Sequence, residues 1–389
     1  MLIVIAPDSY KGSLSAPDVA RAMHTGARRV FSEARFDLIP IADGGEGTVE
    51  AFVEAMGGTF METIVRGPLG DPTTARWGLL DKGKTAVIEM AAASGLPLLD
   101  QDKRDAMNSC TFGTGELVKA ALDAGAETII LGIGGSATND GGSGFARALG
   151  VRFLDAAGQE LKPGGAALAK LASIDISELD PRLAATTFRV ACDVDNPLCG
   201  PRGASAVFGP QKGASAEQVA QLDAALAVFA EKAEKATGKK GVPETAGAGA
   251  AGGLGAGLLF FVNAALMPGI ALVLEAVDFN ARVKSAFLVL TGEGRTDFQT
   301  SYGKTPVGVA LAAKQYGHPV ICISGSLGKG ADDVYACGID AVCSIAPGPI
   351  SLEACMADSG RLLADATERA CRMLKAGMRM TEVETVHAD

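Results

Sequence analysis

Short apolar runs recur along the chain, and most are followed by a glycine-rich polar loop and then by an amphipathic segment. Apolar runs of this length, bounded by glycines, are typical of strands buried in a parallel sheet. The segment after the first loop begins with Ser15-Ala-Pro-Asp18, a helix-start signature, and continues with apolar residues at helical spacing. The repeated order of strand, loop and helix predicts an α/β fold. The strands predicted in this way are residues 2–6, 36–41, 128–133, 287–291 and 320–323.

The two ends of the chain share this order of strand, glycine-rich loop and helix, whereas the middle contains a hairpin-like region, a long polar helix and a glycine run. A chain of 389 residues is long enough for two or three domains. We therefore predict a Rossmann-like or flavodoxin-like parallel-sheet domain built from residues 1–65 and 276–389. A second α/β domain, residues 66–275, is expected to be inserted between these two segments.

Residues 254–274 form a stretch of 21 residues without a charge, which is formally long enough to cross a membrane. Asn263 and the pair Pro268-Gly269 interrupt this stretch, and proline ends or kinks a helix. We therefore predict a buried helix of about 12 residues followed by a second element, and no membrane span.

The segment Gly78-Leu-Leu-Asp-Lys-Gly-Lys-Thr85 matches the Walker A pattern letter for letter. That motif binds phosphate only between a strand and the N-terminus of a helix. Here both flanks are strand-like, so the segment is predicted to be a hairpin turn at Asp81–Lys84.

Composition narrows the class of protein further. Asp plus Glu exceed Lys plus Arg by 45 to 35, giving a net charge of −10, so binding to nucleic acid or an anionic membrane is not expected. The 50 glycines are about 13% of the chain, against a norm of roughly 7%, which places many of them in loops that approach a ligand. The eight cysteines contain no CxxC pair, and no basic segment precedes residue 2, which favours a reducing cytoplasm.

Five loops share one composition: each follows an apolar strand directly and contains glycines beside Ser or Thr hydroxyls and one or two Asp. Glycines let backbone N–H groups converge on an anion, and hydroxyls and lysines add further donors. Carboxylates in the same loops suit Mg²⁺, which takes one or two of them together with phosphate oxygens. The combination favours phosphoryl transfer, where positioning and charge neutralisation do most of the catalysis.

An NAD-dependent hydroxy-acid oxidoreductase is the less favoured alternative. Gly132-Ile-Gly-Gly-Ser-Ala137 matches a dinucleotide-binding fingerprint, and Asp155 follows at a suitable distance. However, residues 138–142 interrupt the helix that should begin at the fingerprint, and Asp155 is predicted to lie in a turn between two short strands.

Six motifs carry a resemblance to a known family: Ile5-Ala-Pro-Asp-Ser-Tyr-Lys-Gly-Ser13, Ile41-Ala-Asp-Gly-Gly-Glu-Gly-Thr48, Ile133-Gly-Gly-Ser-Ala-Thr-Asn-Asp-Gly-Gly142, Ala191-Cys-Asp-Val-Asp-Asn-Pro-Leu198, Phe208-Gly-Pro-Gln-Lys-Gly-Ala214 and Thr291-Gly-Glu-Gly-Arg-Thr-Asp297. Together they closely resemble the bacterial glycerate kinases of the glyoxylate and sugar-acid type, over almost the whole chain. The resemblance implies a two-domain α/β enzyme that uses ATP and Mg²⁺ to phosphorylate (R)-glycerate at the 2-hydroxyl. A 3-phosphoglycerate product stays open, as does a homo-oligomer.

The loops supply candidates for the substrate side of such a reaction, and each candidate has a structural alternative. Lys11 either neutralises the glycerate carboxylate or the transferring phosphoryl group, or is an ordinary solvated lysine. Asp193 and Asn196 either act as proton acceptor and orienting amide, or form an Asx-turn before Pro197. The catalytic candidates are Asp193 and Lys11, and the substrate-binding candidates are Ser9, Lys11, Asp43, Asn196 and Lys212.

Other loop residues are candidates for phosphate and metal binding. The glycine loop at 134–136 either cradles phosphates or is a structural turn. Glu293, Arg295 and Asp297 either face metal and phosphate or form a surface ion pair, and Asp43 and Glu46 are either Mg²⁺ ligands or helix N-terminal charges. The phosphate-binding candidates are Gly134, Gly135, Ser136, Gly292, Gly294 and Arg295, and the metal candidates are Asp43, Glu46 and Asp297.

Overall fold

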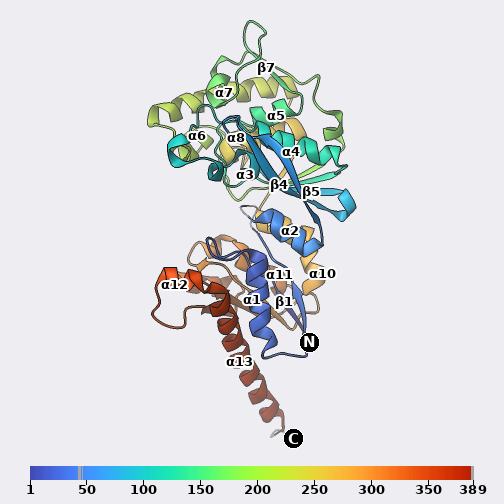
Figure 1. Cartoon of the computed structure of the whole chain (residues 1–389), viewed down its shortest axis with the longest axis vertical. Helices are drawn as coiled ribbons and strands as arrows, with labels where there is room; N and C mark the ends of the chain where they lie inside the picture. Colours follow the sequence, from blue (N-terminus) through green and yellow to red (C-terminus); the bar gives the residue numbers. More distant parts are fainter. Residues whose placement is uncertain (43–44, 46, 387–389) are drawn as a thin grey trace. The chain divides into compact units, whose positions relative to one another are not determined.

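The computed structural model describes residues 1–42, 45 and 47–386. The chain divides into two compact units, of which unit 1 is formed by Met1–Asp43, Glu50–Ala55 and Val273–Asp389. Unit 2 is formed by Gly44–Val49 and Met56–Leu272. The first unit is therefore assembled from both ends of the sequence, which Figure 1 shows as blue and red segments packed together.

Unit 1 contains a five-stranded parallel sheet in the order β15-β13-β11-β1-β2. Counted within this unit, the order is 2-1-3-4-5, the flavodoxin-like arrangement, which confirms the predicted fold class. From β1 the chain adds β2 on one side of the sheet, and it later adds β11, β13 and β15 in turn on the other side. The strand order therefore reverses between β1 and β11. The strands are β1 (Leu2–Ile5), β2 (Arg35–Leu38), β11 (Leu288–Thr291), β13 (Val320–Ser324) and β15 (Ala341–Ser344).

Helices cover both faces of this sheet. Isoleucines and leucines at alternate positions of β1, β11 and β13 pack with α1 (Ala16–Arg28) and α13 (Ser359–Val386) in one core cluster. Right-handed crossovers then place α11 (Thr305–Lys314), which contacts β11 and β13, on the other face. The unit also contains α10 (Phe279–Val283), α12 (Leu352–Ala357), and the short paired strands β12 (Arg295–Thr296) and β14 (Ser326–Leu327).

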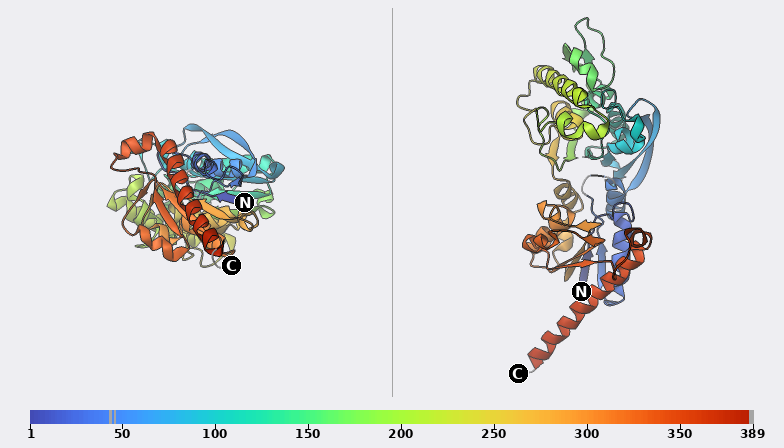
Figure 2. Two further views of the ribbon diagram at one scale, coloured as in Figure 1. Left: turned by 90° about the horizontal axis from the view of Figure 1, so that it is seen from below. Right: turned by 90° about the vertical axis from the view of Figure 1, so that its left-hand side faces the viewer.

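The first and last helices of the chain lie side by side at one glycine. A Cβ atom on Gly26 would lie 2.1 Å from the carbonyl oxygen of Ala364, so only glycine allows this approach of α1 to α13. The later turns of α13 extend beyond the sheet of unit 1 (Figure 2). The close contact therefore joins the two ends of the sequence in one core.

Unit 2 contains a six-stranded mixed sheet in the order β10-β9-β6-β5-β4-β3. Strands β10, β9, β6 and β5 are parallel; β4 pairs antiparallel with β5, and β3 pairs antiparallel with β4 at the edge of the sheet. Because β3 pairs along its whole length with β4, residues 59–66 lie in this sheet, although the expected domain boundary was at residue 65. The strands are β3 (Thr59–Arg66), β4 (Pro72–Leu80), β5 (Thr85–Glu89), β6 (Thr128–Gly132), β9 (Thr187–Ala191) and β10 (Ala265–Met267).

The core of unit 2 is built around four phenylalanine rings at positions 153, 229, 260 and 261, whose paired centroids lie 5.9–6.4 Å apart. A separate two-stranded antiparallel sheet consists of β7 (Arg152–Leu154) and β8 (Ser173–Asp175). The helices of this unit are α3 (Ala91–Ser94), α4 (Phe112–Asp123), α5 (Ser143–Ala148), α6 (Ala204–Phe208), α7 (Ala216–Thr237) and α8 (Ala250–Val262). The residues of α2 (Thr48–Met56) and α9 (Gly269–Ala276) are divided between the two units.

Both misleading sequence motifs have the structures predicted for them. The Walker-like segment is the connection between the antiparallel strands β4 and β5, with a single 3₁₀ turn at Asp81–Gly83. The uncharged stretch becomes α8, then β10, then α9, with Asn263 in a left-handed conformation at the end of α8. Among the described residues, no helix is long and apolar enough to span a membrane.

Candidate functional site

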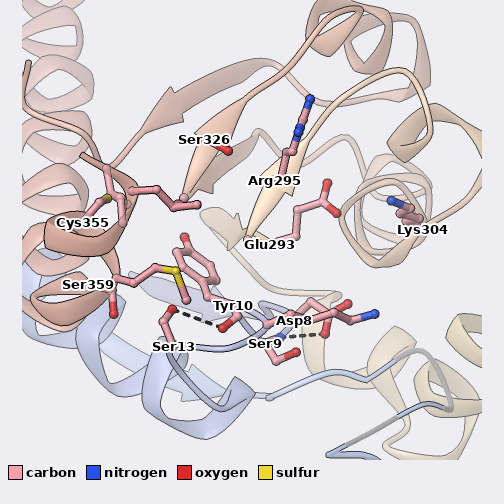
Figure 3. Close-up of a pocket in the computed structure, with 16 residues that line it drawn as sticks. Asp8, Ser9, Tyr10, Ser13, Glu293, Arg295, Lys304, Ser326, Cys355 and Ser359 are labelled. Carbon is pink, nitrogen blue, oxygen red and sulfur yellow. Dashed lines mark hydrogen bonds between the residues drawn. The ribbon is translucent and has the colours of Figure 1, made fainter. Parts of the chain in front are cut away.

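A cavity of about 410 Å³ lies at the carboxyl ends of the parallel strands of unit 1 (Figure 3). Its walls come from the loops that follow β1, β11, β13 and β15, and from α12 and the start of α13. Ligands of open α/β sheets bind at this edge, outside the point where the strand order reverses. The cavity therefore lies where the topology of unit 1 favours a ligand.

Backbone contacts join three of these loops. The N–H of Asp8 donates to the carbonyl of Gly292 (2.8 Å), and the N–H of Ser326 donates to the carbonyl of Gly294 (3.1 Å). A Cβ on Gly292 would lie 1.9 Å from the carbonyl oxygen of Ile323, so this predicted phosphate-binding glycine is required for packing. Gly294 does line the cavity.

Glu293 is a buried carboxylate in the wall of this cavity, with 7% of its surface exposed. Its Oε1 accepts hydrogen bonds from the hydroxyls of Thr300 (2.6 Å) and Thr296 (3.1 Å). Burial raises the pKa of Glu293 above its ordinary value, and the negative charge of Asp8 adds to the rise, while the two hydroxyls oppose it. One side of the carboxylate is thus fixed before any ligand binds.

Asp8 is the second carboxylate of the cavity. Its Oδ1 accepts the N–H of Ser9 (2.6 Å), and its Oδ2 accepts the hydroxyl of Thr305 (2.8 Å), the first residue of α11. No group of three or more His, Cys, Asp or Glu side chains arranged to hold a metal occurs in the described part of the chain. Two carboxylates in one cavity nevertheless fit Mg²⁺, which is commonly held by one or two carboxylates with waters and phosphate oxygens.

Three cationic side chains accompany these carboxylates. Lys11, Arg295 and Lys304 all line the cavity and are exposed. Arg295 Nε lies 3.4 Å from Asp297 Oδ2, so the predicted metal ligand Asp297, which does not line the cavity, is next to a cation. Lys304 has one long hydrogen bond, to Gln299 Oε1 (3.4 Å). The solvated charges of the three cations are available to an anionic ligand.

The remaining wall of the cavity is apolar and comes from α12. It includes Leu352, Cys355 and Met356, of which Leu352 is 73% exposed and Met356 36% exposed. Figure 3 shows Cys355 across the cavity from Glu293 and Lys304. The cavity therefore has one charged side and one apolar side.

Unit 2 has its own glycine-rich loop, which follows β6. Gly134 and Gly135 are exposed, whereas the rest of the segment to residue 142 is buried. Gly135 has a φ of 72°, and its carbonyl accepts the N–H of Leu96 (2.9 Å). Only the first two residues of the predicted phosphate-binding loop thus present their backbone to solvent, and Ser136 is 7% exposed.

Lys212, predicted to bind substrate, is 1% exposed. Its Nζ donates to the hydroxyl of Ser136 (2.7 Å) and to the carbonyl of Thr138 (2.7 Å). Burial lowers the pKa of Lys212 to about 7, although the negative charge of Asp140 opposes the shift. The contacts of this ammonium group are with the glycine-rich loop itself.

Asp140, near the end of the longest motif, is fully buried. Its two oxygens accept the N–H and the hydroxyl of Thr111 and the N–H groups of Gly142 and Gly144 at the start of α5. A carboxylate with this many donors orders the chain around it. The second half of the motif is therefore framework.

The predicted proton acceptor Asp193 is exposed, and its Oδ1 accepts the N–H of Gly269, the first residue of α9 (2.9 Å). Asn196 donates from Nδ2 to the carbonyl of Arg202 (2.7 Å). Both residues lie in the loop that follows β9. The candidates Asp43 and Glu46 lie outside the described residues.

The model of the glycerate kinase family matches residues 3–375. The chain belongs to the glycerate kinase family. It is 54% identical over 382 residues to a glycerate kinase of Bacillus subtilis (strain 168), covering 98% of this chain and 99% of that protein. It is 52% identical over 345 residues to the glycerate 2-kinase of Escherichia coli (strain K12), covering 89% and 90% of the two chains.

A solved structure supports the same placement. The crystal structure of a protein from Salmonella typhimurium LT2, described as glycerate kinase 2, superimposes with a TM-score of 0.90 at 49% identity. It covers 97% of this chain and 99% of that one. The fold of the glycerate kinase family therefore extends over nearly the whole chain, which confirms the resemblance found in the motifs.

The dinucleotide-binding alternative loses its structural support. The helix that should open at residues 132–137 begins only at Ser143, after the buried segment around Asp140. The carboxylate of Asp155 accepts the N–H groups of Ala157 and Gln159, so this residue belongs to a turn, as predicted.

Sequence reasoning did not assign several residues of the unit 1 cavity. Asp8 lay within a quoted motif, and its position directly after a strand was the signal that could have identified it. Lys304 stands just before the Thr305-Pro306 start of α11, a position that favours anion binding. For Leu352 and Met356 the sequence held no signal, because their place in the cavity depends on how α12 packs.

Proposed function

We propose that the protein is a glycerate kinase that transfers the γ-phosphoryl group of ATP to the 2-hydroxyl of (R)-glycerate, giving 2-phosphoglycerate and ADP. The observation that carries this proposal is the likeness over nearly the full length to proteins named as glycerate kinases, one of them a glycerate 2-kinase. The strand-end loops with their glycines, carboxylates and cations support the same chemistry.

In this proposal Mg²⁺ neutralises phosphate charge when it is bound. Asp8 and Glu293 are the described residues that fit it, because hard carboxylate oxygens are its preferred protein ligands. Lys11, Arg295 and Lys304 would neutralise the remaining charge of the phosphates and of the transferring group, which is the largest part of catalysis in phosphoryl transfer.

The acceptor side of the reaction is proposed to use unit 2. Asp193 takes the proton of the attacking hydroxyl, and the N–H of Gly269 fixes one of its oxygens. The exposed backbone of Gly134 and Gly135 suits a carboxylate or phosphate group. Lys212 supports this loop from beneath, through Ser136 and Thr138.

The decisive experiment couples ADP release to a spectrophotometric assay with (R)-glycerate as acceptor. We expect turnover that depends on ATP and is abolished by EDTA, and NMR of the product should identify 2-phosphoglycerate. A 3-phosphoglycerate product would show that the 3-hydroxyl of glycerate, and not the 2-hydroxyl, accepts the phosphoryl group. Oxidation of a hydroxy acid with NAD(H), without phosphoryl transfer, would overturn the proposal.

We further propose a cytoplasmic location, because all eight cysteines are free thiols and ATP is the proposed co-substrate. Cell fractionation followed by immunoblotting tests this location.

A further inference from the structure

We propose that the cavity of unit 1 is the nucleotide site, with the adenine ring against the apolar wall of α12 and the triphosphate on the charged side. This inference rests on the proposed kinase function for the identity of the nucleotide. It assigns one of the two substrates to a defined place, and it moves Ser9 and Lys11 from the glycerate side of the reaction to the ATP side.

The chemistry of the cavity matches a long ligand with two unlike ends. The apolar side is formed by Ile345, Leu352, Cys355 and Met356. Leu352 and Met356 are 73% and 36% exposed, so they have apolar surface that a flat aromatic base would remove from water. Glycerate is a three-carbon hydroxy acid with almost no apolar surface, and it would leave this wall uncovered.

The size of the cavity favours the larger substrate as well. About 410 Å³ lies within the range of roughly 300–1,000 Å³ found for sites of cofactors and drug-sized ligands. A three-carbon acid has few atoms and would occupy only a small part of this volume.

The charged side is arranged for phosphates. Lys304 lines the cavity and directly precedes α11, a helix of ten residues. The positive end of a helix favours anions, and Arg295 adds a guanidinium group. The carboxylates of Asp8 and Glu293 lie among these cations, as a metal-bound triphosphate requires.

The position within the fold agrees with this assignment. The cavity opens beyond the carboxyl ends of β1 and β11, the two strands between which the order reverses. Nucleotides in open parallel sheets bind at this point, because loops from both directions of the chain can reach the ligand there.

The test uses the full chain and the fluorescent analogue mant-ATP as a direct binding probe. Leu352→Glu and Met356→Glu place a charge on the apolar wall, and both positions are exposed, so the fold should tolerate them. Each is expected to weaken mant-ATP binding roughly 10-fold, because the base loses apolar contacts and its binding would remove the new carboxylate from water. Leu311→Glu is the matched control, since Leu311 is 54% exposed on α11 and does not line the cavity.

Inorganic tripolyphosphate separates the two sides of the cavity. As a competitor of mant-ATP it should bind Leu352→Ala as well as it binds the wild-type protein, because it has no base. Lys304→Ala should weaken tripolyphosphate and ATP together, by about 10-fold each, since it removes a charge that contacts only the phosphates.

Steady-state assays give the result that would overturn the inference. We expect the KM for ATP to rise in Leu352→Glu while the KM for glycerate stays within about 2-fold of wild type. A rise in the KM for glycerate alone would assign the cavity to the acceptor. Weakened mant-ATP binding in a protein that does not phosphorylate glycerate would retain the nucleotide site and reject the proposed function.

Discussion

The two glycine-rich regions of the molecule use the same residue types in opposite ways. In unit 1, Lys11 and Arg295 are exposed and line an open cavity. In unit 2, Lys212 is buried beneath the loop at 134–142, and the carboxylate of Asp140 is fully enclosed by N–H and hydroxyl donors. The charges of the first region are solvated, whereas those of the second hold its own backbone.

This difference shows that a motif of glycine, hydroxyl and carboxylate does not by itself tell whether its charged side chains can reach a ligand. What separates the two cases is whether the charged groups remain hydrated. A solvated cation can exchange water for phosphate, but a buried ammonium group that already donates to Ser136 and Thr138 has no such freedom.

The largest expected effect concerns the proton acceptor. Substitution of one carboxylate in each unit shows which unit supplies this group. Asp193→Asn keeps the shape of the side chain and removes its basicity, so kcat should fall by about 10²–10⁴-fold with little change in the KM for ATP. Glu293→Gln should instead raise the KM for Mg·ATP. Steady-state kinetics with both substrates varied provides the measurement.

The matched control for Asp193 is Asp195→Asn, an exposed carboxylate two residues away that pairs with Arg202 (2.9 Å). It should retain wild-type kcat. If Glu293→Gln loses kcat while Asp193→Asn keeps it within a few fold, the proton acceptor belongs to unit 1.

A buried carboxylate and a cavity carboxylate should differ sharply in their effect on stability. Asp140→Asn leaves N–H donors of α5 poorly paired in a buried site, and should lower the free energy of unfolding by about 3 kcal/mol. Asp8→Asn should change it far less and should weaken ATP binding instead. Urea denaturation of both variants tests the contrast, and equal destabilisation would contradict it.

The buried lysine makes stability depend on pH. The pKa of Lys212 is lowered to about 7 in the folded protein, from an ordinary value of 10.5, so between these values the unfolded chain binds more protons. Stability should therefore rise with pH over this window, by at most about 1.4 kcal/mol per unit from this group, and be flat below it.

Lys212→Met removes this contribution, so the difference in unfolding free energy between the wild-type protein and the variant should grow in favour of the wild type as the pH is raised from 7 to 10. The exposed Lys162→Met is the control and should show no such trend. Parallel profiles for wild type and Lys212→Met would show that the ammonium group is not titrating in this range.

The smallest effect on stability is expected for the exposed cation of the cavity. Lys11→Ala should leave the free energy of unfolding within about 0.5 kcal/mol of wild type, because a solvated side chain contributes little. Its effect should appear in the KM for ATP. A large loss of stability would show that Lys11, like Lys212, supports the folded structure.

Local pattern was sufficient for much of the fold and for part of the site. The buried strands, the hairpin at Asp81–Gly83 and the interrupted helix α8 follow from apolar runs and from proline and glycine positions. The burial of Lys212 was not predictable, because it depends on how the turn at Pro210–Lys212 packs against β6 and its loop. The apolar wall of α12 was missed for the same reason, since it depends on packing between distant segments.

The pairing of β1 with β11 also determines the order in which the protein can fold during synthesis. Strand β1 ends at Ile5 and its partner β11 begins at Leu288, so 288 − 5 = 283 residues must be added before the sheet of unit 1 can close. At ribosomal rates of about 5–20 residues per second this takes roughly 15–60 seconds. The strands of unit 2 all lie between these two in the sequence, so unit 2 can form its core before β11, the second partner of β1, has been synthesised.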